Sequence, residues 1–298
     1  MSGPGGDHVD GRRERGTVEV AGSTLHYEAA GTGHPLVLIH AGVADHRMWD
    51  GPFAAFARSY RVIRYDTRGY GASLTEDVEF SNREDLAALL DHLGITRAHL
   101  LGVSRGGQIA MDFTLERPSK VSALIMVASG PGGFHSPDPV PEVETKVFDE
   151  MEAAWEAKEF ERLADLELRF WVDGPGQPEG RVPAPIREHV REMILHNYRT
   201  HAVEGKPQPL KPPAAARLGE ISVPALIVTG DLDTSHIRAA SDFITEHIRG
   251  ARKVVIPGTA HMLSLEQPQT FIQIVQEFLQ EVRLPEGGAP AGGARATG

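Results

Sequence analysis

The heptapeptide Leu-Gly-Val-Ser-Arg-Gly-Gly at 101–107 constrains this chain more than any other stretch. The residues before it, Ala98 to Val103, are apolar and suit a buried strand, whereas Gln108 to Glu116 suit a helix. A Gly-x-Ser-x-Gly turn between a strand and a helix is tight and strained, and it presents the hydroxyl of Ser104 at the edge of a sheet. The pattern alone also fits a glycine-containing turn with an incidental serine, so its meaning depends on partner residues.

Two later loops contain residues that can activate a serine. A hydroxyl is a weak nucleophile that needs a base, and the base needs an orienting group. The loops Gly230–Asp233 and Gly258–His261 each follow an apolar run of β type. In open α/β sheets, ligands bind at the carboxyl ends of the strands. We therefore expect Ser104, an aspartate and His261 at one edge of one sheet.

This arrangement resembles the α/β-hydrolase family, in its serine hydrolase and esterase branch, over about Thr17 to Val282. The resemblance implies a mostly parallel eight-stranded sheet flanked by helices, with a helical cap inserted after the sixth strand. It also implies a catalytic triad of Ser104, Asp233 and His261, with no metal or other cofactor. Asp231 is the alternative acid, and its other interpretation is a residue that caps the turn through backbone hydrogen bonds.

The resemblance further implies an oxyanion hole, in which backbone N–H groups stabilise the charge that develops on a carbonyl oxygen. One donor is the N–H of Arg105, which follows the nucleophile. The second is expected from the loop after the strand at 35–39, at Gly42. Ala41 stands where relatives usually carry glycine, which leaves the identity of this donor open. In the family, the histidine at the position of His40 is a structural residue that braces this loop, and we expect the same role for His40.

Asp66-Thr-Arg-Gly-Tyr-Gly-Ala-Ser73 matches a further turn of this family, and its glycines suit a tight bend. We expect Asp66 and Arg68 to form a structural ion pair with each other rather than to catalyse. Trp49, further along the loop that follows His40, is expected to pack beneath that loop.

The chain is expected to form one domain with an insertion. Helices are expected at 81–93, capped by Ser81 or Asn82, and at Phe271 to Val282. Strands are expected near 17–20, 23–29, 35–40, 60–65, 97–103, 121–127, 223–229 and 252–257. The expected parts are a disordered tail at 1–16, a hydrolase core at 17–132 and 216–284, a helical cap at 133–215 and a disordered tail at 285–298.

About ninety residues between the sixth and seventh expected strands exceed what the bare fold needs. Apolar residues recur there at helical spacing, in three sets: Val143, Val147, Met151 and Trp155; Phe160, Leu163, Leu166 and Phe170; Ile186, Val190, Met193, Ile194 and Asn197. We expect this cap to cover Ser104 and to form an apolar pocket. The candidate pocket residues are Phe134, Trp155, Phe170, Trp171 and Met193.

Composition narrows the classes of function. The chain has no cysteine, which excludes thiol nucleophiles, disulfides and cysteine-bound metals. Its formal net charge of −11 disfavours nucleic acid and anionic membranes as partners. The first sixteen residues lack the apolar core of a signal peptide, and no stretch approaches the ~20 apolar residues of a membrane span. We therefore expect a cytoplasmic protein, and its oligomeric state stays open.

The sequence thus favours a serine hydrolase that cleaves a small, largely apolar carboxylic ester or lactone through an acyl-enzyme. Perhydrolases of the haloperoxidase-like type, carbon–carbon bond hydrolases and aminopeptidases share these motifs and remain alternatives. For an aminopeptidase, cap acids such as Glu144 would have to grip an ammonium group, but they fit a solvated helix face better. A ligand-binding receptor on a hydrolase scaffold is the alternative from another class.

Overall fold

A computed structural model describes residues 13–201, 203 and 205–284. Its eight-stranded sheet has the order β1-β2-β4-β3-β6-β7-β9-β10. Pairing is antiparallel from β1 to β2 and from β2 to β4, and parallel across the rest of the sheet. The strands are β1 (Glu14–Val20), β2 (Ser23–Ala30), β3 (Pro35–Ile39), β4 (Arg61–Tyr65), β6 (Ala98–Val103), β7 (Val121–Val127), β9 (Ala225–Gly230) and β10 (Arg252–Ile256). The predicted α/β fold with a mostly parallel sheet is confirmed.

Helices cover both faces of this sheet because the central strands are apolar on both sides. In β3, Leu36 and Leu38 belong to one hydrophobic cluster and Val37 and Ile39 to the other. The first cluster includes side chains of α1 (Asp50–Phe56) and α9 (Pro268–Glu281). The second includes α2 (Asn82–His92), α3 (Arg105–Glu116) and α7 (Ser235–His247). The short helix α8 (Leu263–Glu266) precedes α9.

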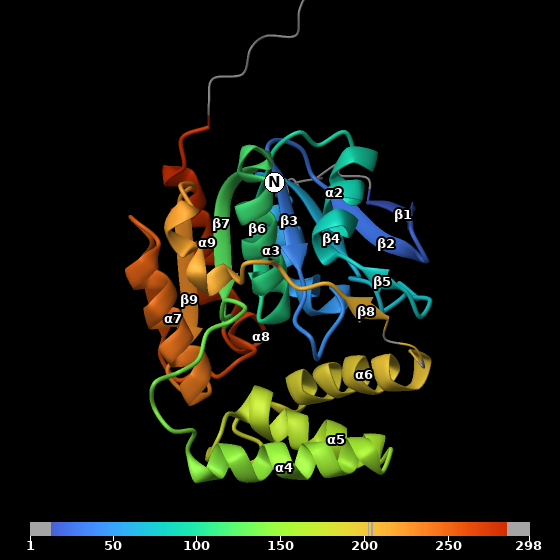
Figure 1. The fold of residues 1–298 in the computed structure, drawn as a ribbon, viewed down its shortest axis with the longest axis vertical. Coiled ribbons are helices and arrows are strands. Elements are labelled where there is room, and N and C mark those ends of the chain that lie inside the picture. The colour runs from blue at the N-terminus through green and yellow to red at the C-terminus, as the bar shows by residue number, and fades with distance from the viewer. Residues whose placement is uncertain (1–12, 202, 204, 285–298) are drawn as a thin grey trace, which may run out of the picture.

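Three α-helices lie in the described part of the chain between β7 and β9, in the region expected to be the cap. They are α4 (Glu142–Glu156), α5 (Phe160–Glu167) and α6 (Ala184–Thr200), with a π-helical segment, Leu168–Asp173, directly after α5. In Figure 1 they form a separate layer at the lower end of the molecule. The apolar face of α6 packs on the main core through Val190 and Met193, which are fully buried.

Some expected boundaries were wrong. Residues 14–16 were assigned to a disordered tail, but they pair with β2 as the start of β1. Residues 1–12 of that tail and the expected tail at 285–298 lie outside the described residues. The sequence analysis also missed a two-stranded parallel sheet of β5 (Glu79–Phe80) and β8 (Lys206–Pro207), which ties the end of the inserted region to the core. Of the two expected N-cap residues of α2, it is Ser81 that takes this position, and its hydroxyl accepts a hydrogen bond from the Glu84 N–H.

Candidate active site

Ser104 lies in a strained turn between β6 and α3. Its backbone has φ 53° and ψ −117°, a left-handed conformation that is costly for a residue with a side chain. The turn requires glycine on both sides. A Cβ at Gly102 would lie 2.1 Å from the Gly106 carbonyl oxygen, and a Cβ at Gly106 would lie 2.3 Å from that of Ile39. The close approach of α3 to β3 and β6 thus explains both glycines.

The chain holds Ser104 in place through its backbone. The Ser104 N–H donates to the Val127 carbonyl at 2.8 Å, and the Ser129 hydroxyl donates to the Ser104 carbonyl at 2.7 Å. Ser104 itself is only partly buried. It lines a cavity of about 300 Å³ together with Gln108 and His236. A polar hydroxyl on a braced, strained turn at a cavity wall is suited to nucleophilic attack.

His261 and Asp233 form a buried pair after β10 and β9. The Nδ1 atom of His261 lies 3.0 Å from each carboxylate oxygen of Asp233, and both side chains are almost fully buried. Asp233 also accepts a hydrogen bond from the Thr234 N–H at 2.7 Å. With a proton on Nδ1, the Nε2 atom of His261 keeps its lone pair and can act as a base. Asp231, the alternative acid, instead accepts a hydrogen bond from the Gly258 N–H.

The inserted helices contact this histidine directly. The Trp171 ring lies 4.6 Å from the His261 ring between centroids, and the His261 N–H donates to the Trp171 carbonyl at 3.2 Å. Trp171 belongs to the π-helical segment, a distortion that often marks functional sites. Glu144 was expected on a solvated face, but it is buried and accepts hydrogen bonds from the N–H and hydroxyl of Ser235. The inserted region is therefore fastened to the loops that carry Asp233 and His261.

The loop after β3 presents two candidate oxyanion donors together with the start of α3. The Ala41 N–H donates to the Met48 sulfur at 3.3 Å, so the residue in the usual glycine position is already engaged. Among the residues that the structure describes, no acceptor meets the N–H of Gly42 or that of Arg105. These two N–H groups are free to bind a developing oxyanion.

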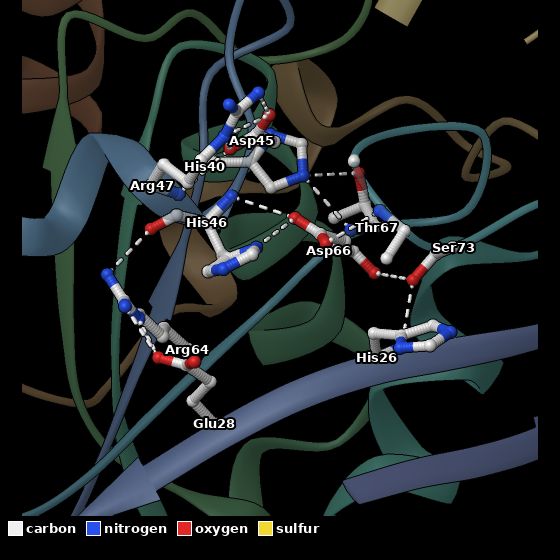
Figure 2. Close-up of polar contacts among 12 residues, drawn as sticks. His26, Glu28, His40, Asp45, His46, Arg47, Arg64, Asp66, Thr67 and Ser73 are labelled. Carbon is white, nitrogen blue, oxygen red and sulfur yellow. Dashed lines mark hydrogen bonds and ion pairs between the residues drawn. The ribbon is translucent and has the colours of Figure 1, made fainter. Parts of the chain in front are cut away.

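His40 braces this loop as a neutral imidazole. Its Nδ1–H donates to the Ala41 carbonyl at 2.8 Å, and its Nε2 accepts from the Thr67 N–H at 3.0 Å. Burial lowers the pKa of His40 to about 4, so it stays uncharged at neutral pH. Figure 2 shows His40 facing Thr67 across the turn that follows β4. Trp49 is fully buried and its ring packs against that of Phe271, so it is a packing residue, as expected.

The expected ion pair between Asp66 and Arg68 was wrong. Asp66 accepts hydrogen bonds from the N–H and Nδ1 of His46, both at 2.8 Å, as Figure 2 shows. Arg68 makes a buried two-pronged ion pair with Asp85 of α2, at 2.8 and 2.9 Å. Side chains two residues apart in this turn point to different partners, so adjacency in the sequence did not identify the pair.

Asp45, His46 and Asp66 place three ligand-type atoms within 4.8 Å of one another. Each side chain already has a protein partner. The Asp45 carboxylate accepts hydrogen bonds from the guanidinium and the backbone N–H of Arg47. The Asp66 carboxylate accepts hydrogen bonds from His46 and from the Ala72 N–H. Burial works to lower the pKa of His46, but the hydrogen bond to Asp66 and the attraction of the Asp66 and Asp45 charges together exceed it, so this pKa is raised. This cluster supports the loop through hydrogen bonds and ion pairs (Figure 2).

A larger cavity, of about 380 Å³, lies between α6 and the core. Gly42, Tyr70 and Arg105 line it on the core side, and Trp155, Glu167 and Tyr198 line it on the side of the inserted helices. It therefore adjoins the candidate oxyanion hole. Of the five expected pocket residues, Trp155 lines this cavity.

The other expected pocket residues lie elsewhere. Phe170 and Met193 are 1% and 0% exposed and belong to the hydrophobic packing between the helices. Phe134 packs on His236, at 5.3 Å between ring centroids, and on Phe243. Trp171 contacts His261, as described above. Helical stripes predicted the three inserted helices, but they did not separate exposed residues, cavity walls and interior packing, since Val143 and Trp155 of the first stripe are 47% and 45% exposed.

Glu167 is a cavity residue that the sequence analysis missed. It is 8% exposed, its Oε1 accepts from the Tyr198 hydroxyl at 2.8 Å, and its Oε2 has no partner among the described residues. Burial raises the pKa of Glu167 to about 7, and the hydrogen bond from Tyr198 opposes this rise only in part. The sequence pattern could have identified it, because Glu167 falls at helical spacing between Leu163 and Phe170 on an otherwise apolar helix face.

Comparison with known proteins agrees with this geometry. The family model described as "Alpha/beta hydrolase family" matches residues 36–274. A 2-hydroxy-6-oxononadienedioate/2-hydroxy-6-oxononatrienedioate hydrolase of Burkholderia vietnamiensis is 30% identical over 86% of this chain and 91% of its own length. A pimeloyl-[acyl-carrier protein] methyl ester esterase of Aeromonas hydrophila is 30% identical over 85% of this chain and 98% of its own length. The crystal structure of a hydrolase from Pseudomonas aeruginosa superposes with a TM-score of 0.70 at 25% identity, covering 92% of this chain and 99% of that one.

The chain therefore belongs to the α/β-hydrolase family and is a hydrolase. Within the described residues, no helix is long and apolar enough to cross a membrane.

Proposed function

We propose that this hydrolase cleaves a small carboxylic ester or lactone through an acyl-enzyme on Ser104. The observation that carries the proposal is the strained turn of Ser104 at the sheet edge where the buried Asp233–His261 pair also lies. Relatives named as a methyl ester esterase and as a 3-oxoadipate enol-lactonase support an acyl substrate.

The proposed reaction has two halves. Ser104 attacks the carbonyl carbon while Nε2 of His261 takes the hydroxyl proton, and Asp233 stabilises the resulting imidazolium. The N–H groups of Gly42 and Arg105 hold the oxyanion, and the protonated His261 then gives its proton to the leaving alcohol oxygen. Water, activated by the same histidine, releases the acid and restores Ser104. The helices α4 to α6 cover the site in this proposal, and all of these steps use groups of the chain itself.

Carbon–carbon bond hydrolysis is the second candidate. It is favoured by the relative from Burkholderia vietnamiensis and by a 2-hydroxy-6-oxo-6-phenylhexa-2,4-dienoate hydrolase of Comamonas testosteroni, 28% identical over 86% of this chain. The same residues would act on a ketone, but the proton would pass to a carbon leaving group. The compound in the name of the second relative is the probe for this reaction.

The two candidates separate in one set of assays. Wild type, Ser104→Ala and the control Ser136→Ala, at a half-buried serine outside the candidate site, are given 4-nitrophenyl butyrate and, separately, 2-hydroxy-6-oxo-6-phenylhexa-2,4-dienoate. We expect wild type and Ser136→Ala to hydrolyse the ester at equal rates, and Ser104→Ala to lose at least about 10³-fold in kcat. Ester hydrolysis that survives in Ser104→Ala contradicts the proposal. Turnover of the dienoate with none of the ester favours the second candidate.

A further inference from the structure

The guanidinium of Arg105 is fixed in the wall of the 380 Å³ cavity by neutral groups. It donates to the Thr67 hydroxyl at 2.6 Å and to the Asn82 side-chain oxygen at 3.2 Å, and it lies 4.6 Å from the Tyr70 ring centroid. Among the described residues, no carboxylate forms an ion pair with it. The neighbouring buried arginine Arg68 differs, since it pairs with Asp85. Arg105 thus holds a rigid positive charge that no acid of the described chain neutralises.

The remaining titratable groups of the cavity leave this charge uncompensated. Arg68 is neutralised by Asp85, and burial lowers the pKa of His201, which keeps that imidazole neutral. Burial raises the pKa of Glu167 to about 7, so this carboxyl is at most partly charged at neutral pH. The cavity therefore favours a ligand that carries a negative charge near Arg105.

Arg105 also lies close to the expected reaction centre. It follows Ser104 directly, and its own N–H is one of the two proposed oxyanion donors. Its side chain runs along the other donor residue, because a Cβ at Gly42 would lie 3.7 Å from Cδ of Arg105. One molecule can therefore contact both the guanidinium and the two candidate oxyanion donors.

We propose that Arg105 binds a carboxylate of the substrate, so that the hydrolysed ester or lactone carries a free acid group at the end of its short apolar chain. The planar guanidinium binds a carboxylate through two parallel hydrogen bonds, for which Arg105 has unused N–H groups. This inference rests on the proposed ester hydrolysis, and it makes Arg105 a specificity-determining residue.

The test compares two esters that differ only at the far end of the acyl chain. They are 4-nitrophenyl hydrogen glutarate and the neutral 4-nitrophenyl glutaramate, assayed with subtraction of spontaneous hydrolysis. Wild type should prefer the acid by roughly tenfold to hundredfold in kcat/KM, mostly through KM. Arg105→Gln should abolish that preference and Arg105→Lys should restore part of it. Arg117→Gln, which removes a charge from the other end of α3, should leave the preference unchanged.

Two results would overturn the inference. One is a wild type without preference for the acid ester. The other is an Arg105→Gln variant that slows both esters equally, which would make the side chain a brace for the loop through Thr67 and His40. If wild type turns over neither of these esters nor 4-nitrophenyl butyrate, the proposed function fails, and titration calorimetry with monomethyl glutarate then decides the inference. Binding that weakens at least about tenfold in a folded Arg105→Gln supports it, while absent or unchanged binding overturns it.

Discussion

Replacing Glu167 by glutamine should make the protein more stable at pH 8 and change its stability much less at pH 5. The amide keeps the shape of the side chain and an oxygen that accepts from the Tyr198 hydroxyl. It removes the ionisation of a carboxyl that is 8% exposed and has one oxygen without a partner in the described chain. The comparison therefore isolates the free-energy cost of burying this charge.

The magnitude follows from the pKa of Glu167, which burial raises from 4.5 to about 7. In the unfolded chain the carboxyl loses its proton near pH 4.5, whereas in the folded protein it keeps the proton until about pH 7. The folded state therefore binds more protons between these values, and the free energy of unfolding falls as the pH rises through them. At 1.36 kcal/mol per pKa unit, the loss is about 3 kcal/mol in total, of which roughly 2.5 falls between pH 5 and pH 8.

Urea denaturation of wild type and Glu167→Gln at pH 5 and pH 8 measures this effect. The difference between the two proteins should change by about 2.5 kcal/mol in favour of the variant at the higher pH. Other buried groups titrate alike in both proteins, so their contributions cancel in the difference between the two free energies of unfolding. Glu161→Gln, on the exposed side of the same helix, serves as the control without a buried carboxyl. An equal difference at both pH values would refute the reasoning, because Glu167 would then titrate alike in the folded and unfolded chain.

Three further substitutions test other parts of the structure. Asp233→Asn should lower kcat for ester hydrolysis on the order of 10³–10⁴-fold, because the imidazole tautomer is lost, whereas Asp231→Asn should lower it by less than about tenfold. Gly102→Ala should lower the free energy of unfolding by about 3 kcal/mol or more, since its Cβ would clash with the backbone of the following helix. Arg68→Met should cost about 3–5 kcal/mol in urea denaturation by leaving Asp85 buried without a partner, and a further Asp85→Leu change should recover most of that loss.

Local chemistry explains which features were predictable from the sequence. The turn around Ser104 was predictable because only glycine fits at 102 and 106, and this steric requirement is visible in the sequence as a Gly-x-Ser-x-Gly pattern. The strands and the order of Asp233 and His261 followed from apolar runs and the loops after them. These are short-range patterns, and each depends on a few neighbouring residues.

Long-range partners were not predictable in the same way. The pairing of β5 with β8 joins two-residue strands that no propensity detects, across more than a hundred residues of chain. Arg68 pairs with Asp85 rather than with Asp66, which depends on how the turn meets α2. Phe170 and Trp155 both belong to apolar helical stripes, but one is interior and the other lines the cavity. Only the packed structure distinguishes them.

Intact-mass analysis after treatment with a fluorophosphonate tests the central claim most directly, because such a probe reacts with an activated serine. We predict a single adduct on wild type, mapped to Ser104, and no adduct on folded Ser104→Ala. Asp233→Asn should label far more slowly than wild type. An adduct that persists in Ser104→Ala, or a folded wild type that a small probe never labels, would contradict the account of Ser104 as the nucleophile.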